Sequence, residues 1–501
     1  MPGVYGGNLS IDSDRVQVIV VRTNARDPRF FELFSAAVRT GLKYVALAET
    51  GKTHIGTHTP WPELTLQDNG LPYVSNKTYD CPKKYSDAID GMWSALFTAI
   101  VGSDEQALDF SKEPEFLALT EYVKTNSRLS TYFIHHKDRE FGDIRLRTIV
   151  GEVLDRYIHM NNTFDLDRDK LLAVYLPIEN YLFEETLPFL VVVPILSLKF
   201  DLREFRINEV AWVEELSDDI HLARGWQGPY SHSDNDLIES AATHALFISG
   251  LHFENKDWVS LGQLQMQPES FPIEMIDTFF AALRISMGYI TGYAQLLALP
   301  VGWASGYTAN LTPLDRLTAN SYPPLIEAWR EEIPVVDSIE VDLIRECFKN
   351  LRHAFGTSHS RKVRLAMHRL NLSAMRTTEE DGVIDAMIAM EALLSDGPQE
   401  MTHKIAMRVA ALYKIFDPER SEQVFKEMKR IYLFRSKIVH GDSDLDKFRE
   451  IDRDGGKVTA VNAAVEHLRI AFWMLIKNPS LLEPAKIDSF LLTDKLQSPG
   501  I

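Results

Sequence analysis

Residues 458–475, VTAVNAAVEHLRIAFWML, decide the fold of the C-terminal third of this 501-residue chain. Apolar side chains recur in this stretch at alternating steps of three and four residues, which is the spacing that lines one face of an α-helix. We therefore predict a helix over residues 457–477 that buries one stripe against neighbouring helices. The stripe consists of Val458, Val461, Val465, Leu468, Phe472 and Leu475.

The segments between Pro334 and this stretch also show the apolar spacing of helices. Asp417-Pro418 supplies a capping acid and a first-turn proline, and Gly441 marks a helix end. The periodic segments predict helices at residues 337–354, 361–374, 379–395, 400–415 and 419–440. Together they predict an all-α bundle over residues 335–480, followed by a C-terminal tail at residues 481–501.

The first 330 residues mix strand and helix patterns. Apolar and β-branched runs predict strands at residues 16–21, 44–48, 171–178, 189–200 and 205–213. Helical spacing predicts helices at residues 30–39, 85–101, 114–125, 141–159 and 273–287. Residues 51–83, rich in Thr, Pro, Gly and Asn, predict a loop, and the proline-rich passage 302–334 predicts a domain boundary.

The predicted fold class is therefore α+β and multidomain. A mixed α/β region of unknown role occupies residues 1–165. A β-rich middle region at residues 166–330 ends in a helix, and the all-α bundle follows it.

Charge is distributed unevenly along the chain. The composition, 45% hydrophobic and 25% charged, is that of a globular protein and excludes a disordered or collagen-like chain. The net charge of −18 repels polyanions from most of the surface. Residues 337–478 carry 23 Lys and Arg against 22 Asp and Glu, so the acidity lies outside the predicted bundle. If any part of the chain contacts nucleic acid, the bundle is the better candidate.

The sequence favours the cytoplasm and predicts no membrane attachment. The longest strongly apolar run, residues 187–198, is shorter than the roughly 20 residues that span a bilayer. The N-terminal MPGVYGG has no basic segment followed by an apolar one, so we expect no secretion signal. Cys81 and Cys347 stand alone, which argues against a disulfide framework and a thiolate zinc site.

No cofactor or metal ion is predicted from the sequence. His54 and His58 share one loop without further ligands nearby in the sequence. Ordinary loop histidines are the favoured interpretation of this pair, and a metal site is the less favoured one.

Three charged residues fall on the apolar stripes of the predicted bundle. Glu391 lies on the stripe of helix 379–395, Arg408 on that of helix 400–415 and Arg435 on that of helix 419–440. A buried ion costs several kcal/mol unless it is paired and hydrogen-bonded, so we expect these residues to be partners or to line a cleft. An internal salt bridge of Glu391 with Arg408 or Arg435 is an equally weighted interpretation.

The segment RSKIVH at residues 435–440 favours the interpretation that these charged residues line a cleft over that of an internal salt bridge. An arginine and a histidine that face one phosphodiester can cleave RNA without a metal ion. The imidazole takes the proton from the 2′-hydroxyl or gives one to the leaving 5′-oxygen, and the guanidinium holds the charge on the phosphorus oxygens. Such a pair also arises by chance in a chain of this length, so its spacing alone identifies no nuclease.

Three ordered sequence blocks are more specific than that spacing. They are DAMIAMEALL at residues 385–394, IAMRVAA at residues 405–411 and RSKIVHG at residues 435–441. With these blocks, the span from about 378 to 465 resembles the HEPN domain, a helical module of ribonucleases whose signature is Arg, four to six residues, then His. The ApeA-like branch is the most similar. In about the first 270 residues we recognise no family pattern.

This resemblance implies that Arg435 and His440 are catalytic in a groove formed by two protomers. It also implies a role in toxin or anti-phage defence systems. Supporting residues are Glu391, Arg408, Ser436 and Lys437, although Ser436 keeps only a hydroxyl where the superfamily commonly has Asn, Asp or His. The implied partners are an RNA substrate, a second copy of the chain, and a phage-derived or cellular trigger at the N-terminal region.

Helix geometry sets a condition on this site. Five residues of straight α-helix rotate by about 500°, which leaves Arg435 and His440 of one chain about 140° apart. Either the helix loosens before Gly441, or Arg435 of one chain works beside His440 of another. The alternative function is a non-catalytic module that dimerises or binds a nucleotide or RNA within a larger complex.

Overall fold

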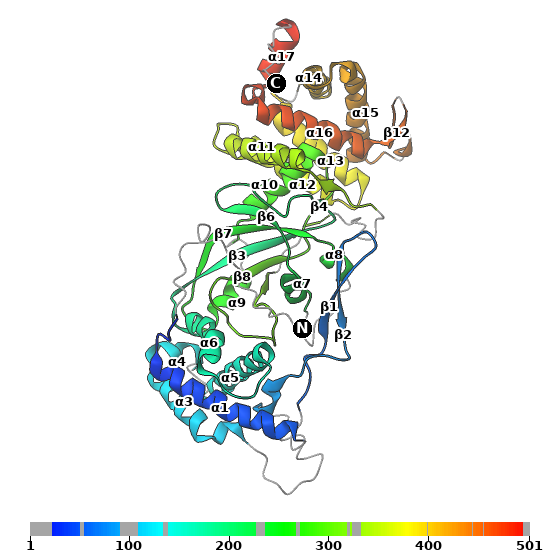
Figure 1. Ribbon diagram of the computed structural model, residues 1–501. Coiled ribbons are helices and arrows are strands. Elements are labelled where there is room, and N and C mark those ends of the chain that lie inside the picture. Colours follow the sequence, from blue (N-terminus) through cyan, green and yellow to red (C-terminus); the bar gives the residue numbers. More distant parts are fainter. Residues whose placement is uncertain are drawn as a thin grey trace.

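The computed structural model describes residues 23–50, 55–90, 109–133, 139–226, 236–266, 271–317, 321–322, 332–397, 399–442, 444–453 and 455–493. These residues form three stacked parts (Figure 1): N-terminal helices at one end, a central sheet, and a C-terminal helical bundle at the other end. The mixed α+β architecture, with a β-rich middle and an all-helical C-terminal region, confirms the predicted fold class. The predicted strand at residues 16–21 lies outside the described residues, as do residues 91–101 of the helix predicted at residues 85–101, whose start forms a 3-10 turn.

The N-terminal part packs around α1 (Pro28–Glu49), which begins where the Asp27 carboxylate accepts a hydrogen bond from the Phe30 amide. Rings of Phe34 and Tyr175 meet in its core, with centroids 5.2 Å apart. The other elements are η1 (Tyr85–Ala88), η2 (Phe110–Lys112), α3 (Pro114–Thr125), α4 (Ser127–Phe133), α5 (Arg139–Asn161) and α6 (Arg168–Phe183). The helices predicted at residues 114–125 and 141–159 are therefore confirmed, and that predicted at residues 30–39 is the first half of α1.

Two predicted strands of this region are helical. Residues 44–48 continue α1, because Tyr44, Val45 and Ala48 extend its buried face. Residues 171–178 lie in α6, whose start is capped by Asp167. β-Branched and aromatic residues favour strands only weakly, so packing of these segments against other helices decides their structure.

The predicted loop at residues 51–83 contains a β-hairpin. Strands β1 (Trp61–Leu66) and β2 (Pro72–Lys77) pair antiparallel. The turn between them contains Asn69 and Gly70, and Gly70 has a φ of 74°, which favours glycine. The hairpin runs beside the central sheet and contacts α7 and α8 (Figure 1).

The central sheet has six antiparallel strands in the order β5-β6-β7-β3-β8-β9. Both faces of β3 are buried: Leu190 and Val192 pack on one side, Val191 and Val193 on the other. This double burial explains why the strand reads as a continuous apolar run. The strands are β3 (Thr186–Ile195), β5 (Glu204–Arg206), β6 (Ala211–Glu215), β7 (His244–Glu254), β8 (Leu296–Pro300) and β9 (Asp315–Leu317).

The strand predicted at residues 205–213 is a hairpin of β5 and β6. The Asn208 side chain accepts hydrogen bonds from the amides of Val210 and Ala211 and so stabilises the reversal of the chain. Short strands β4 (Lys199–Phe200) and β10 (Val335–Val336) pair in parallel beside the sheet. Short helices α7 (Asp218–Gly225), α8 (Asp236–Ser240) and α9 (Ser260–Gln265) complete the middle part.

Helix α10 (Ile273–Met287) lies between the sheet and the bundle (Figure 1) and has the predicted bounds. It packs against α11, α12 and α16 of the bundle. Arg284 is buried at its C-terminal end and donates hydrogen bonds to Asn371 of α12 and to the carbonyl of Thr291. The bundle therefore shares a core with a helix that precedes the loop-rich passage 302–334.

The bundle contains the predicted helices and two additions. Strands β11 (Glu450–Arg453) and β12 (Gly456–Thr459) form a small antiparallel hairpin, so the helix predicted from residue 457 starts at 460. The segment set apart as a tail contains α17, which packs against α14. The helices are α11 (Ser338–Phe355), α12 (Ser360–Met375), α13 (Glu379–Leu394), α14 (Met401–Phe416), α15 (Ser421–His440), α16 (Ala460–Lys477) and α17 (Pro484–Thr493), with turns η4 (Pro418–Arg420), η5 (Asp446–Phe448) and η6 (Pro479–Leu482). Within the described ranges, no helix is both long and apolar enough to cross a bilayer.

A buried ionic network fixes the core of the bundle. Glu427 of α15 accepts hydrogen bonds from His467 of α16, at 2.7 Å, and from two nitrogens of Arg453 in β11. His467 in turn contacts the Tyr413 hydroxyl at 2.9 Å. Burial would raise the pKa of Glu427, but the hydrogen bonds from His467 and Arg453 outweigh it and lower the pKa to about 2.

This network predicts an acid-sensitive contribution to stability. Glu427→Gln should lower the free energy of unfolding at pH 7 by about 3 kcal/mol, because a buried charge loses its partner. The folded pKa lies below the ordinary 4.5, so the stabilisation is complete above pH 4.5 and declines as the pH falls toward 2. Urea titrations at several pH values should show the gap between wild type and Glu427→Gln closing over that interval.

The exposed Glu422, which pairs with Lys426 on the same helix, provides the matched control. Glu422→Gln should leave the urea midpoint unchanged at every pH, because exposed ion pairs contribute little. Equal effects of the two substitutions would contradict the assigned role of Glu427.

Candidate functional site

The charged residues predicted on the bundle stripes occupy different environments. In α14, Arg408 faces inward and is 0% exposed. In α13, Glu391 lies on a half-buried flank, while Met387, Met390 and Leu394 fill the buried face. In α15, Arg435 likewise lies beside the buried Ile431 and Phe434 rather than on the inward face. Of the three, only Arg408 is fully buried, and Glu391 and Arg435 keep 20% and 25% of their side-chain surface exposed.

Arg408 is a structural residue. Its guanidinium donates hydrogen bonds to both carboxylate oxygens of Asp488 in α17, to Asp396 and to the carbonyl of Leu394. The hydrogen bonds to Asp488 raise the pKa of Arg408 above its ordinary value, although burial alone would lower that pKa. Arg408 does not pair with Glu391 or Arg435, and it fastens α17 to α14.

Glu391 and Arg435 form the second expected pair, but a loose one. Arg435 Nη2 lies 3.7 Å from Glu391 Oε1, and the two side chains keep 25% and 20% of their surface exposed. Arg435 Nε and Glu391 Oε1 are both shielded from water, and within the described residues neither makes a hydrogen bond. Buried polar atoms are nearly always hydrogen-bonded. The Arg435 guanidinium is an exception, because its Nε donor has no acceptor among the described residues.

Tyr432 belongs to the same group, although the sequence did not single it out. Its ring lies one turn before Arg435, with the guanidinium carbon 5.7 Å from the ring centroid. Burial, together with the nearby Glu391 carboxylate, raises the pKa of the Tyr432 hydroxyl. The three-residue spacing on α15 was the available signal, because residues three apart share a helix face.

The remaining predicted residues lie at the end of α15. His440 is exposed as the last helical residue, and Ser436 is half-buried. Lys437 Nζ binds Asp442 at 2.8 Å and lies 5.1 Å from the Phe448 ring. This ion pair lowers the pKa of Asp442. The structure brings Lys437 to an acidic partner and leaves the His440 imidazole open to solvent.

Helix α15 stays regular through His440. It ends only at Gly441, whose φ of 72° closes the helix while its amide bonds to the carbonyl of Ile438. The helix therefore does not loosen before Gly441 to bring His440 back to Arg435. Within one chain these side chains point in different directions, about 140° apart around the axis.

This arrangement defines the candidate site by its residues: Glu391, Tyr432, Arg435 and His440. The guanidinium offers a fixed cation with a free donor, which suits a phosphate or another oxyanion. The His440 imidazole is open to solvent and can donate or accept a proton. The carboxylate of Glu391 orients the arginine and competes with any anion for it.

A different cluster has the residues to hold a metal ion. In the described part of the chain, His58, Asp155 and His159 place one ligand atom each within 4.8 Å of one another. Asp155 and His159 lie on α5, and His58 lies in the loop before β1. Helix α5 is at the end of the molecule opposite α15 (Figure 1). No sequence spacing linked His58 to α5, although Asp155 and His159 stand four residues apart on one helix face.

Comparison with known proteins assigns this chain to no family. No family model, curated protein or solved structure matches this chain. The similarity to the HEPN domain therefore remains a prediction from three sequence blocks, and the site is argued from its own geometry.

The contrast between Arg408 and Arg435 predicts effects of different size on stability. Arg408→Met should lower the free energy of unfolding by roughly 2 kcal/mol, because α17 loses the charge-assisted hydrogen bonds that fasten it to α14, while Asp396 and Asp488 remain partly exposed to water. Arg435→Met should change it by less than about 1 kcal/mol, since a loose and partly exposed pair contributes little. Urea unfolding measures both, and hydrogen exchange in α17 should rise only in Arg408→Met. Similar losses in the two variants would contradict this distinction.

Proposed function

We propose that the chain is a metal-independent endoribonuclease of the toxin or anti-phage defence type, in which Arg435 and His440 act at one scissile phosphodiester. The observation that carries the proposal is the incomplete bonding of Arg435. Arg369 of α12 also has an unbonded, shielded Nε, but its Nη1 donates to Asp385, whereas Arg435 within the described residues makes only the 3.7 Å ion pair with Glu391 and keeps a partly open face. An exposed histidine follows it on the same helix.

The regular helix supports a composite site formed by two chains. Since Arg435 and His440 of one α15 diverge, a two-fold axis beside the helix end brings Arg435 of one protomer toward His440 of the other. Such an axis makes two equivalent pairs. This homodimer is part of the proposal, as are an RNA substrate and a cytoplasmic location.

The proposed reaction follows from the two functional groups. The 2′-oxygen attacks phosphorus, the bond from phosphorus to the 5′-oxygen breaks, and a 2′,3′-cyclic phosphate forms. The His440 imidazole of the pair removes the proton of the 2′-hydroxyl, and the leaving 5′-oxygen takes a proton from water. Arg435 binds the phosphoryl oxygens, on which negative charge increases. Glu391 is a positioning residue that holds the guanidinium until RNA replaces it.

The N-terminal two-thirds would then serve as the regulatory part. The acidity outside residues 337–478 disfavours RNA at those surfaces, so RNA approaches the bundle. In this proposal, a phage-derived or cellular trigger acts on the N-terminal region to control cleavage.

The alternative is a non-catalytic bundle that dimerises or binds a nucleotide or RNA. The ion pair between Glu391 and Arg435 favours it, because the arginine already has a partner within its own chain. The two functions differ in one outcome, cleavage of RNA in the presence of a chelator.

The first test replaces each proposed catalytic residue. Arg435→Ala and His440→Ala should each lower cleavage of total RNA in EDTA by roughly 100-fold or more, because each removes one element of transition-state stabilisation. Lys429→Ala, an exposed cation of the same helix, and His353→Ala, an exposed histidine of α11, are the matched controls and should keep the wild-type rate. Unchanged cleavage in either test variant would remove that residue from the site.

A mixing experiment tests the composite site. A dimer of one Arg435→Ala chain and one His440→Ala chain retains one intact pair if the two residues act across the interface. Random subunit exchange should therefore restore about a quarter of the wild-type cleavage rate from two inactive proteins. If the pair acts within one chain, mixing restores nothing, and the two-chain geometry is wrong.

A further inference from the structure

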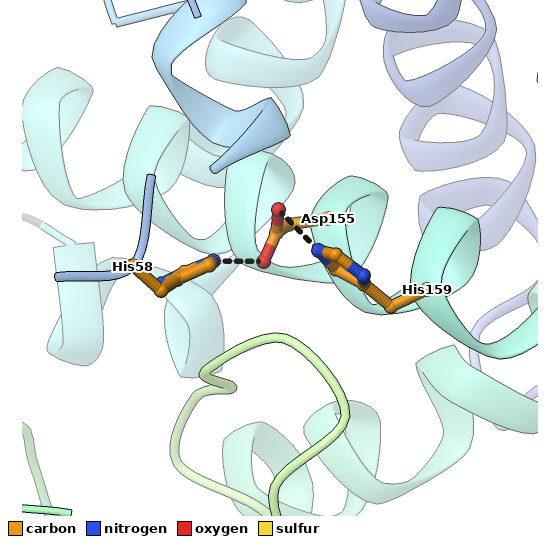
Figure 2. Close-up of side chains that lie close together, drawn as sticks. All are labelled: His58, Asp155 and His159. Carbon is orange, nitrogen blue, oxygen red and sulfur yellow. Dashed lines mark hydrogen bonds and ion pairs between the residues drawn. The ribbon is translucent and has the colours of Figure 1, made fainter. Parts of the chain in front are cut away.

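Two histidines and one aspartate meet where the loop before β1 crosses helix α5. His58 belongs to the loop, and Asp155 and His159 stand one turn apart on α5. Figure 2 shows the Asp155 carboxylate between the two imidazole rings, with one oxygen toward each ring. Residues nearly 100 positions apart in the sequence thus share one centre.

The ligand atoms are close enough for one ion. Asp155 Oδ2 lies 2.8 Å from His58 Nε2, and Asp155 Oδ1 lies 3.6 Å from His159 Nε2. All three ligand atoms lie within 4.8 Å of one another. A tetrahedral ion with bonds of about 2.0 to 2.2 Å needs its ligands roughly 3.3 to 3.5 Å apart, so small side-chain rotations suffice.

The surroundings hold these side chains in place. The Asp155 carboxylate accepts hydrogen bonds from the amides of Tyr85, at 2.7 Å, and Ala309, at 3.2 Å. The His159 ring packs against the Tyr85 ring, with centroids 5.2 Å apart. Such contacts orient ligands around metal ions in proteins.

The centre is shielded but reachable. The side chains of His58, Asp155 and His159 are 9%, 2% and 17% exposed. A cavity of about 320 Å³ adjoins His58 and Asp155, and its lining includes Thr57, Lys84 and Glu152. An ion therefore has an entry path, which a metal site requires.

We propose that His58, Asp155 and His159 bind one divalent transition-metal ion, for which Zn²⁺ is the matching probe. Two imidazoles and one carboxylate are a ligand set that zinc and its neighbours favour over Mg²⁺ or Ca²⁺, which prefer oxygen alone. The ion joins the loop before β1 to α5. The carbonyl of Lys83, 2.8 Å from His159 Nε2, is the hydrogen-bond acceptor that the histidine gives up on binding.

The competing explanation is a hydrogen-bonded hub without an ion. In that case the imidazoles only donate to Asp155 and to Lys83. The two explanations differ in whether the full-length chain takes up zinc at this place.

The test uses full-length protein without a histidine tag, stripped with chelator and titrated with ZnCl₂ in a calorimeter. The wild type should bind one equivalent, and His58→Gln and His159→Gln should each weaken binding at least tenfold. His353→Gln and His403→Gln, at exposed histidines in the bundle, should bind like the wild type. Zinc should also raise the melting temperature of the wild type and not that of His58→Gln.

Two results would overturn the proposal: no zinc binding by the wild type, or equal affinity in wild type, His58→Gln and His159→Gln. If both variants fail to fold, CoCl₂ added to the wild type decides. Visible absorption bands of tetrahedral cobalt without a thiolate charge-transfer band support the site. An octahedral spectrum or a thiolate band rejects it.

Discussion

A charged group removed from water must be surrounded by partners, and this constraint organises the C-terminal bundle. Glu427 joins α15 to α16 and to the β11–β12 hairpin through His467 and Arg453. Arg408 joins α14 to α17 through Asp488. These pairs set the register of the helices, because apolar stripes alone tolerate sliding and rotation. The bundle therefore presents its α15 surface in a defined geometry.

Arg435 departs from this constraint. It has a carboxylate at 3.7 Å, an aromatic ring and an unused donor where Arg408 has four hydrogen bonds. In the proposed function, an anionic ligand completes the bonding of this guanidinium. His440 adds a proton-transfer group at the end of the same helix. The proposed nuclease rests on this contrast together with the resemblance of residues 378–465 to the HEPN domain, and not on the Arg-His spacing alone.

The sequence best predicted the elements whose ends are set by residues at their own boundaries. Helix α10 has the predicted bounds because Pro272 opens it and Gly288, with a φ of 77°, closes it. The strands predicted at residues 44–48 and 171–178 were wrong. Packing against neighbouring helices, rather than β propensity, makes these segments helical. The hairpin around Asn69-Gly70 carried a recognisable turn signal that the loop-like composition of residues 51–83 concealed.

The site was predictable in part for the same reason. The stripes indicated a pair of Glu391 with Arg408 or Arg435, and the structure has the second of these. Asp396 and Asp488, the partners of Arg408, lie outside any stripe. Contacts such as that of His58 with Asp155 join segments that only the fold brings together. The most direct test of the central claim is end-group analysis of RNA cleaved in EDTA. The account predicts 2′,3′-cyclic phosphate and 5′-hydroxyl ends; 5′-phosphate ends, or cleavage that the chelator abolishes, would contradict it.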